Sequence, residues 1–301
     1  MATNSIQNKA KIRYSIIGAG KVATTLAQKL QDNGLLDFVY LKNPNREKSL
    51  LSFGIEQTKI TDKFEFITNS NCIIIAVNDS AIPDVVEKLN INLCNLPEHN
   101  QFIFHTSGFV PALALKQLAD KGINVFAAHP VQTFFYPNQD LLKGITWNIE
   151  NYNTDPKIIE TIIKDLDGSV QFLSPDVTEN KELYHLISVI ASNFVTTTIE
   201  FSKLIAGDLK ITDLTFLSNL IKTTTENCIR NINDKNVPLT GPIARKDYNA
   251  IKGYLDKIAY NTAFKSILIN YLSANLEILY QKGIYNQSEK QELEQIIKKY
   301  Q

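Results

Sequence analysis

The chain has 301 residues, of which 44% are apolar, and this length predicts two domains rather than one. Its 31 Lys and Arg residues balance 31 Asp and Glu residues, so no global field favours nucleic acid or an anionic membrane surface as a partner. The three cysteines, Cys72, Cys94 and Cys228, lie far apart without CxxC spacing, which argues against a disulfide framework and a zinc site. We therefore predict no metal.

The N-terminal residues 1–11 lack the apolar segment of a signal peptide. No apolar run reaches the roughly 18 residues that a membrane helix needs. We expect a cytoplasmic protein whose residues 1–10 form a disordered tail.

Short β-rich runs alternate with helix-like segments in the first half of the chain. The predicted strands are 12–17, 38–41, 72–77, 102–105, 125–128, 145–149 and 170–173. The predicted helices are 22–32, 46–53, 82–93, 111–121 and 156–166. Such alternation predicts βαβ units in a doubly wound parallel sheet, an α/β domain over residues 11–175.

After Ser174-Pro175 the pattern becomes helical. The predicted helices are 176–206, 211–232, 247–258, 262–282 and 288–300, with an irregular break at 233–246. This pattern predicts a separate all-α domain over residues 176–301. Because no flexible linker joins the two domains, we expect them to pack closely around a cleft.

A glycine-rich turn follows the first predicted strand. Gly18 permits a tight turn, Gly20 lets the backbone approach a pyrophosphate, and the small Ala23 lets helix and strand pack closely. The N-terminus of the next helix offers free N–H groups to phosphates. The turn therefore predicts a dinucleotide site that includes Gly18, Ala19, Gly20, Lys21 and Val22. A tight turn in a fold without a ligand is the alternative.

The segment after the second strand carries basic rather than acidic side chains. An NAD site usually places Asp or Glu here to bind the ribose 2′-hydroxyl, but no acid appears before Glu47. Lys42, Asn43 and Arg46 suit a 2′-phosphate instead, so we predict NADPH in preference to NADH. The same charges are also typical of a solvated helix start.

Polar groups follow three of the predicted strands, at the sheet edge where ligands of α/β folds bind. They are Val77-Asn78-Asp79, His105-Thr106-Ser107-Gly108 and Ala128-His129-Pro130. We expect Asn78 near the nicotinamide ribose and Ser107 near substrate or cofactor. A single histidine at such a position is more often structural, but His105 and His129 share one edge.

The predicted helix 176–206 carries a polar stripe. Lys181, His185, Ser188 and Ser192 fall within about 60° of one helix face, with Asn193 to one side. Apolar residues surround the stripe, which indicates a cleft rather than open solvent. A solvated helix edge remains the alternative. A Lys in such a stripe can hold or protonate a carbonyl oxygen during hydride transfer.

An irregular loop, residues 239–247, precedes the next helix. Asp247 is a plausible N-cap, which explains its presence without a ligand. A cap does not explain Arg245, which suits an acidic group of a substrate or a carboxylate of the chain.

Seven segments occur in an order that resembles one known family. They are GAGKVA at 18–23, AVND at 76–79, HTSG at 105–108, HPVQTF at 129–134, KELYH at 181–185, ASN at 191–193 and LTGPIARKD at 239–247. Members of the family join a Rossmann-like NADP-binding domain to a helical domain of unknown function. They are similar in organisation to ketopantoate reductase, pyrroline-5-carboxylate reductase and the 6-phosphogluconate dehydrogenase group, whose C-terminal domain is also helical.

The resemblance implies an oxidoreductase that forms a homodimer through the helical domain. In the related dehydrogenases a Lys on the first long helix of that domain serves catalysis, with Asn or His about one turn later, and Lys181 and His185 match that spacing. Lys246 departs from the pattern, because we expect Gly there.

These observations predict an NADP-dependent oxidoreductase that transfers a hydride between NADPH and a small carbonyl or imine compound. The predicted catalytic residues are Lys181, His185, His105, Ser107, Asn193 and Arg245. The predicted cofactor residues are Gly18, Ala19, Gly20, Lys21, Val22, Lys42, Asn43, Arg46, Val77, Asn78, Asp79 and Ser107. A dinucleotide-binding sensor without catalysis is the alternative function. A purely structural protein would leave the glycine turn unused.

Overall fold

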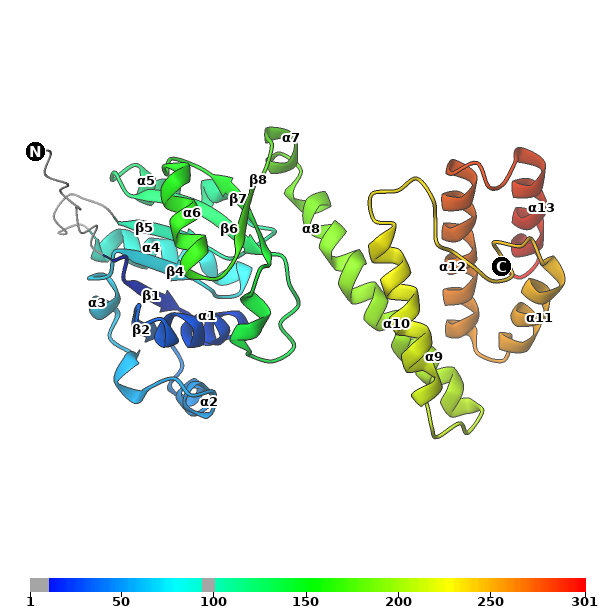
Figure 1. Ribbon diagram of the computed structural model, residues 1–301, viewed down its shortest axis with the longest axis horizontal. Helices are drawn as coiled ribbons and strands as arrows, with labels where there is room; N and C mark the ends of the chain where they lie inside the picture. The colour runs from blue at the N-terminus through cyan, green and yellow to red at the C-terminus, as the bar shows by residue number, and fades with distance from the viewer. Residues whose placement is uncertain (1–10, 94–100) are drawn as a thin grey trace, which may run out of the picture. The chain divides into compact units, whose positions relative to one another are not determined.

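The computed structural model describes residues 11–93 and 101–301. The predicted tail at 1–10 and Cys94 lie outside the described residues. The chain divides into two compact units, residues 1–199 and 200–301, which are described separately below (Figure 1).

The first unit contains an eight-stranded sheet in the order β3-β2-β1-β4-β5-β6-β7-β8. Its strands are β1 Tyr14–Ile17, β2 Leu36–Tyr40, β3 Ile60–Thr61, β4 Cys72–Ile75, β5 Phe102–His105, β6 Asn124–Pro130, β7 Thr146–Asn151 and β8 Ser169–Phe172. The order reverses between β1 and β4, so their carboxyl ends mark the switch point where ligands of doubly wound folds bind. The predicted Rossmann-like α/β fold is confirmed.

One strand pairing differs from the parallel sheet that we predicted. β7 runs antiparallel to β6, with His129 opposite Asn148 and Ala127 opposite Glu150. A parallel connection needs a long crossover, usually a helix, but residues 131–145 contain only the 3₁₀ turn Gln139–Leu142. The sequence already contained an indication of the antiparallel pairing, because no helix was predicted between the two strands.

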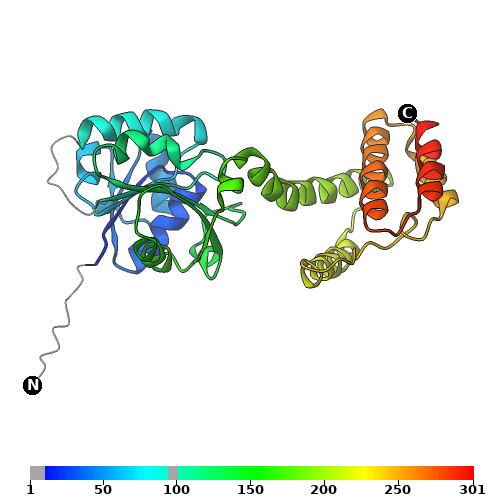
Figure 2. The same ribbon diagram turned by 90° about the horizontal axis from the view of Figure 1, so that it is seen from above.

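Helices cover both faces of this sheet (Figure 2). The helices of the first unit are α1 Lys21–Asp32, α2 Glu47–Ser52, α3 Phe64–Ile67, α4 Ile82–Asn92, α5 Lys116–Ala119, α6 Pro156–Asp165, α7 Pro175–Thr178 and α8 Lys181–Val189. Side chains of α1 and α6, such as Leu26 and Ile162, pack with Ile16 on one face. Those of α4 and α5, such as Val86 and Leu118, pack with Ile75 on the other. Because the strands are buried on both faces, their sequences are continuous runs of apolar residues.

The helical segment after residue 175 is not the single helix that was predicted over 176–206. It consists of α7, α8, a π-helical turn Ile190–Phe194 and α9 Val195–Asp208. In the π turn the Ser192 hydroxyl donates to the Ser188 carbonyl oxygen over 2.6 Å, and such back-bonding competes with the backbone ladder. α8 contacts the sheet through the Lys181–Glu150 ion pair, and the first compact unit extends to residue 199.

The second unit is helical. Its remaining helices are α10 Thr215–Arg230, α11 Tyr248–Ile258, α12 Thr262–Gln281 and α13 Gln287–Lys298. Ile251, Leu276 and Leu293 represent the core that α11, α12 and α13 share. Asn286 and Glu289 form a capping box at the start of α13. This unit matches the predicted helices closely, because strong periodicity and caps define them.

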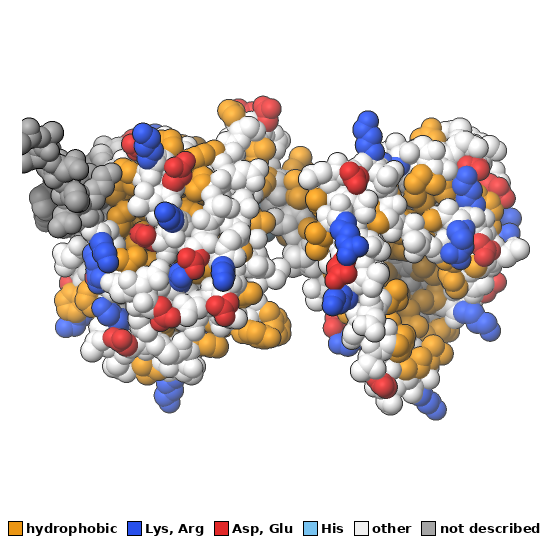
Figure 3. Space-filling model, viewed as in Figure 1, with side chains coloured by type: hydrophobic (Ala, Val, Ile, Leu, Met, Phe, Trp, Pro, Cys, Tyr) orange, Lys and Arg blue, Asp and Glu red, His pale blue; other side chains and the backbone are white. Residues whose placement is uncertain are grey.

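Two further properties concern the surface. Within the described residues no helix is long and apolar enough to cross a membrane. Figure 3 shows basic and acidic side chains interspersed on the face in view, in line with the balanced charge of the chain.

Candidate functional site

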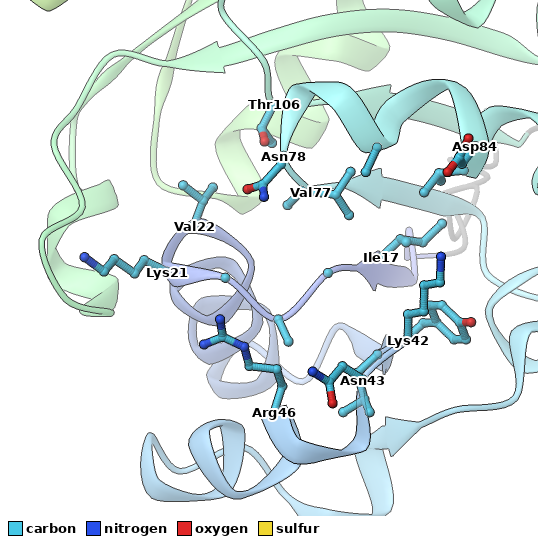
Figure 4. A pocket seen from close by; sticks show the side chains of 18 of the residues that line it. Ile17, Lys21, Val22, Lys42, Asn43, Arg46, Val77, Asn78, Asp84 and Thr106 are labelled. Atoms are coloured by element: carbon cyan, nitrogen blue, oxygen red, sulfur yellow. The ribbon is translucent and has the colours of Figure 1, made fainter.

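A cavity of about 860 Å³ opens at the switch point between β1 and β4. All the predicted cofactor residues except Asp79 and Ser107 line it (Figure 4). Sequence reasoning missed the lining residues Tyr40, Phe64, Asp84, Val85, Lys88, Thr106 and Phe134. The volume is within the range typical of small-molecule and cofactor sites, which is about 300–1,000 Å³.

The glycine turn has the geometry that close backbone approach requires. Gly18 has φ +130°, and a Cβ built on it would lie 2.2 Å from the Ala76 carbonyl oxygen. A Cβ on Gly20 would meet no atom within 4 Å, so this position faces open space. The first turn of α1 holds no acidic residue, and its N–H groups have no intrahelical partners. The turn therefore fits a pyrophosphate.

Basic side chains surround the other end of the cavity. In Figure 4 the Arg46 side chain reaches toward the glycine turn from one side, while Asn78 and Thr106 lie on the opposite side. Lys42 and Lys88 also line the cavity, and Asp84 is the one acidic residue among the described residues that line it. Glu47 follows Arg46, but its carboxylate accepts a hydrogen bond from the Gln57 side chain. This end therefore suits an anionic group.

Lys21 lies apart from this basic group. Its ammonium lies 5.1 Å from the centroid of the Phe135 ring, and its side chain points away from the cavity in Figure 4. Lys88 donates to the Tyr40 hydroxyl over 2.8 Å and lies 4.2 Å from the Phe64 ring centroid. These two contacts hold Lys88 at the wall. The helical spacing of Asp84 and Lys88 on α4 was the signal that would have identified them.

His105 ends β5 in a fully buried position. Its Nε2 lies 3.3 Å from the Pro111 carbonyl oxygen, so this nitrogen carries the hydrogen, and Nδ1 has no hydrogen-bond partner. Burial lowers the pKa of His105 to about 4, and the charge of Lys181 contributes in the same direction. His105 is therefore a neutral imidazole near pH 7.

The loop after β5 connects the cavity with a second polar cluster. Thr106 lines the cavity. The Ser107 hydroxyl oxygen accepts hydrogen bonds from the Phe109 and Val110 amides at 3.1 and 2.9 Å, which fixes the loop. A Cβ on Gly108 would lie 2.9 Å from the His129 ring, so the backbone lies directly against that ring.

We call the second group the α8 cluster: His105, His129, Asn148, Glu150, Lys181, Tyr184 and His185. It forms because β6, β7 and α8 meet on one face of the sheet. The Lys181 ammonium lies 3.1 Å from Glu150 Oε2, and only 5% of the Lys181 side chain is exposed. The Tyr184 hydroxyl accepts from Asn148 Nδ2 at 2.7 Å and lies 3.1 Å from His129 Nδ1.

The other predicted catalytic residues lie around or away from this cluster. The His185 ring stacks against His129 with centroids 6.1 Å apart and contacts the Phe109 ring edge-on. Asn193 is exposed in the π turn. Arg245 is an exposed residue of the second unit. Asp79 affects His105 and His129 electrostatically, since it raises the pKa of each against the larger lowering by burial.

Sequence reasoning missed Tyr184, Asn148 and Glu150. Tyr184 is one turn after Lys181 on the same helix face. Asn148 and Glu150 point to the same face of β7 because side chains alternate along a strand. Their placement opposite His129 and Ala127 depends on the antiparallel pairing, which the sequence pattern did not predict.

The backbone conformation at Lys246 explains how the chain accommodates Lys where the family pattern has Gly. Lys246 has φ +59°, the left-handed conformation that favours the expected Gly. Its ammonium binds Glu289 at 2.7 Å. Lys246 thus adopts the backbone conformation of a glycine, and the ion pair fixes its side chain.

His105, which is buried, and His129, which is half-buried, make stability depend on pH. Burial also lowers the pKa of His129 to about 4, helped by His185 and Lys181. Because the folded state disfavours protonation, the unfolded state binds more protons between pH 6.5 and 4, and stability falls as the pH falls through this window. We expect each histidine to lower the free energy of unfolding by about 2 kcal/mol between pH 7 and pH 5.

Urea unfolding at the two pH values measures this loss. The matched variant is His105→Gln, which should lose less stability on acidification than the unchanged chain. Equal losses in the two proteins would contradict the role of His105.

Comparisons with known proteins identify the two parts of the chain. Residues 1–130 match the family described as a Rossmann-like domain, and residues 145–268 match a domain of unknown function, DUF2520. The chain thus combines the two domain types that the sequence resemblance implied. No curated protein matches the chain.

Several solved structures share the fold. A candidate NADP oxidoreductase from Bacteroides fragilis is 20% identical, with a TM-score of 0.68 over 88% of this chain and 97% of the other. An imine reductase from Myxococcus stipitatus in complex with NADP⁺ is 13% identical, with a TM-score of 0.57 over 95% and 93%. A pyrroline-5-carboxylate reductase from Coxiella burnetii is 15% identical, with a TM-score of 0.51 over 92% and 99%. At these identities the likeness establishes a common fold.

Proposed function

We propose that this protein is an NADP-dependent reductase that transfers a hydride between NADPH and a small carbonyl or imine compound. The observation that carries the proposal is the cavity at the glycine turn, which reaches Thr106, while the following residues of the same loop contact the α8 cluster. The shared fold with oxidoreductases supports it. A dinucleotide sensor needs no buried polar cluster beside its cofactor site.

The chain's residues fit the cofactor as follows. Gly18, Gly20 and the start of α1 hold the pyrophosphate. Lys42 and Arg46 bind the 2′-phosphate, and Asn78 lies at the ribose of the nicotinamide. When bound, NADPH supplies a hydride from its nicotinamide ring.

The α8 cluster provides the groups that handle the proton. Lys181 and His185 remain proposed catalytic residues, with Ser107 and Asn193 orienting the substrate. The geometry adds one constraint, because the Lys181 ammonium is bound to Glu150. This ion pair favours an electrostatic role for Lys181 over free proton donation.

The experiment that tests the function measures NADPH binding and then NADPH oxidation with a panel of oxo acids and cyclic imines. Oxidation with one of these compounds would support the reductase. NADPH binding without any turnover would favour the sensor, and failure to bind any dinucleotide would contradict both functions. We also propose a homodimer, for which analytical ultracentrifugation gives the mass.

The cofactor preference gives a sharper prediction. Arg46→Ala should raise the Kd for NADPH about 10- to 100-fold, because a charge-assisted hydrogen bond to the 2′-phosphate is lost. The Kd for NADH should stay within about threefold. Fluorescence titration of both cofactors measures the two constants.

Lys48→Ala is the matched control, since Lys48 is exposed, lies two residues after Arg46 in the chain and does not line the cavity. Equal losses of NADPH and NADH affinity in Arg46→Ala, or stronger binding of NADH by the unchanged chain, would contradict the NADPH preference.

A further inference from the structure

The hydroxyl of Tyr184 occupies the centre of the α8 cluster. Asn148 Nδ2 lies 2.7 Å from it and His129 Nδ1 lies 3.1 Å from it. Three elements, α8, β7 and β6, therefore fix one oxygen atom.

The hydrogen-bond pattern leaves the Tyr184 proton available. A hydroxyl has one hydrogen to donate and two lone pairs that accept. Asn148 Nδ2 only donates, so it occupies one lone pair. When His129 carries its hydrogen on Nδ1, it occupies the second lone pair, and the Tyr184 hydrogen points to a third partner.

Of the neighbouring ionisable groups, two are uncharged near pH 7 and two others are held by contacts with other side chains. The pKa values of His105 and His129 are lowered to about 4, mainly by burial, so both rings are neutral. The Lys181 ammonium is bound to Glu150, and Asp79 acts on His129 only as a charge that raises its pKa. His185 stacks on His129 and contacts Phe109. Burial raises the pKa of Tyr184, so its hydroxyl keeps its proton at this pH.

The cluster also contains two buried acceptor atoms that receive no hydrogen bond. His105 Nδ1 and Asn148 Oδ1 are buried without a hydrogen-bond partner. The loop from Thr106 to Gly108 joins them to the cofactor cavity, since Thr106 lines the cavity and Gly108 lies against the His129 ring. A polar compound bound here would lie between the cavity and Tyr184.

We propose that Tyr184 is the proton donor of the reductase, a role that rests on the proposed function. As the substrate carbon receives the hydride, the electron pair of its C=O or C=N bond moves to oxygen or nitrogen. That atom forms a bond to the Tyr184 hydrogen, and the O–H bond of Tyr184 breaks. The product is an alcohol or an amine, and Tyr184 becomes a phenolate.

The surrounding groups stabilise this phenolate. Asn148 Nδ2 donates to it, and the Lys181 ammonium lies 5.5 Å from the centroid of its ring. After the product leaves, the phenolate takes a proton from a solvent water molecule, which departs as hydroxide, and His129 keeps its hydrogen on Nδ1. Asn148 and His129 thus act as positioning residues, while the charge of Lys181 favours the phenolate.

The test replaces Tyr184 with phenylalanine, which removes only the hydroxyl. With NADPH and the probes 2-methyl-1-pyrroline and 2-oxobutanoate, we expect kcat to fall about 100- to 10,000-fold, the usual contribution of general acid catalysis. The Kd for NADPH should stay within about threefold, since the hydroxyl binds neither pyrophosphate nor 2′-phosphate. The KM for each probe should also stay within about threefold. Tyr254→Phe, an exposed tyrosine of the second unit, is the control and should match the unchanged chain.

A second readout needs no turnover. In the protein without cofactor, the ¹⁵N signal of His129 Nδ1 should shift in Tyr184→Phe and stay in place in Tyr254→Phe. Unchanged turnover or an unchanged His129 signal in Tyr184→Phe would overturn the role of Tyr184 alone. If the unchanged chain binds NADPH and reduces neither these probes nor the wider panel, the proposed function fails and the donor role fails with it.

Discussion

Gly18→Ala is expected to abolish NADPH binding, with a Kd at least about 100-fold higher than that of the unchanged chain. The added Cβ would lie 2.2 Å from the Ala76 carbonyl oxygen, and Gly18 has φ +130°, where side chains are strained. The backbone must shift, and the turn that holds the pyrophosphate shifts with it. Fluorescence titration with NADPH measures the loss.

Gly34→Ala is the matched control for this variant. Gly34 also has a positive φ, +67°, but a Cβ there would meet no atom within 4 Å. It should therefore share the backbone strain without the clash and keep NADPH affinity within about threefold. If Gly18→Ala binds NADPH as tightly as Gly34→Ala does, the glycine turn does not hold the cofactor.

Lys181→Ala is expected to lower turnover far more than cofactor affinity. The substitution removes the ammonium beside the Tyr184 ring and leaves the Glu150 carboxylate, 12% exposed, without its partner. Breaking a buried ion pair costs about 3–5 kcal/mol, so the free energy of unfolding should also fall. Steady-state kinetics, NADPH titration and urea unfolding separate the three effects.

A double variant distinguishes catalysis from stability. Lys181→Met with Glu150→Gln removes both charges, and it should recover most of the lost stability because no unpaired charge stays buried. Turnover should remain low. Unchanged turnover in Lys181→Ala would refute a catalytic role. Full recovery of turnover in the double variant would show that Lys181 has only a structural role.

The fold was largely predictable from the sequence because its signals are local. Apolar runs such as 72–77 gave the buried strands, and the N-cap Asp247 gave the start of α11. The short elements β3 and α3 were missed because two to four residues show no period. The direction of β7 was missed because alternation of strands and helices was extended across residues 131–145, where no helix occurs.

The site was predictable only where its residues belong to one continuous segment of the chain. The glycine turn and the basic residues after β2 belong to local motifs, and the structure brings them to one cavity. The α8 cluster depends on three segments far apart in the chain. Asn148 reaches Tyr184 only because β7 is antiparallel, so no local pattern links the two residues.

The π turn has a consequence for aligning related chains. An α-helix advances about 100° per residue, so the one residue that a π turn adds rotates everything after it by that angle. A comparison that treats 181–208 as one uninterrupted helix assigns every α9 side chain to the wrong direction. Against a chain with an uninterrupted α-helix at this place, alignment requires one unmatched residue between 190 and 194, and only then do equivalent positions of α9 share a common orientation.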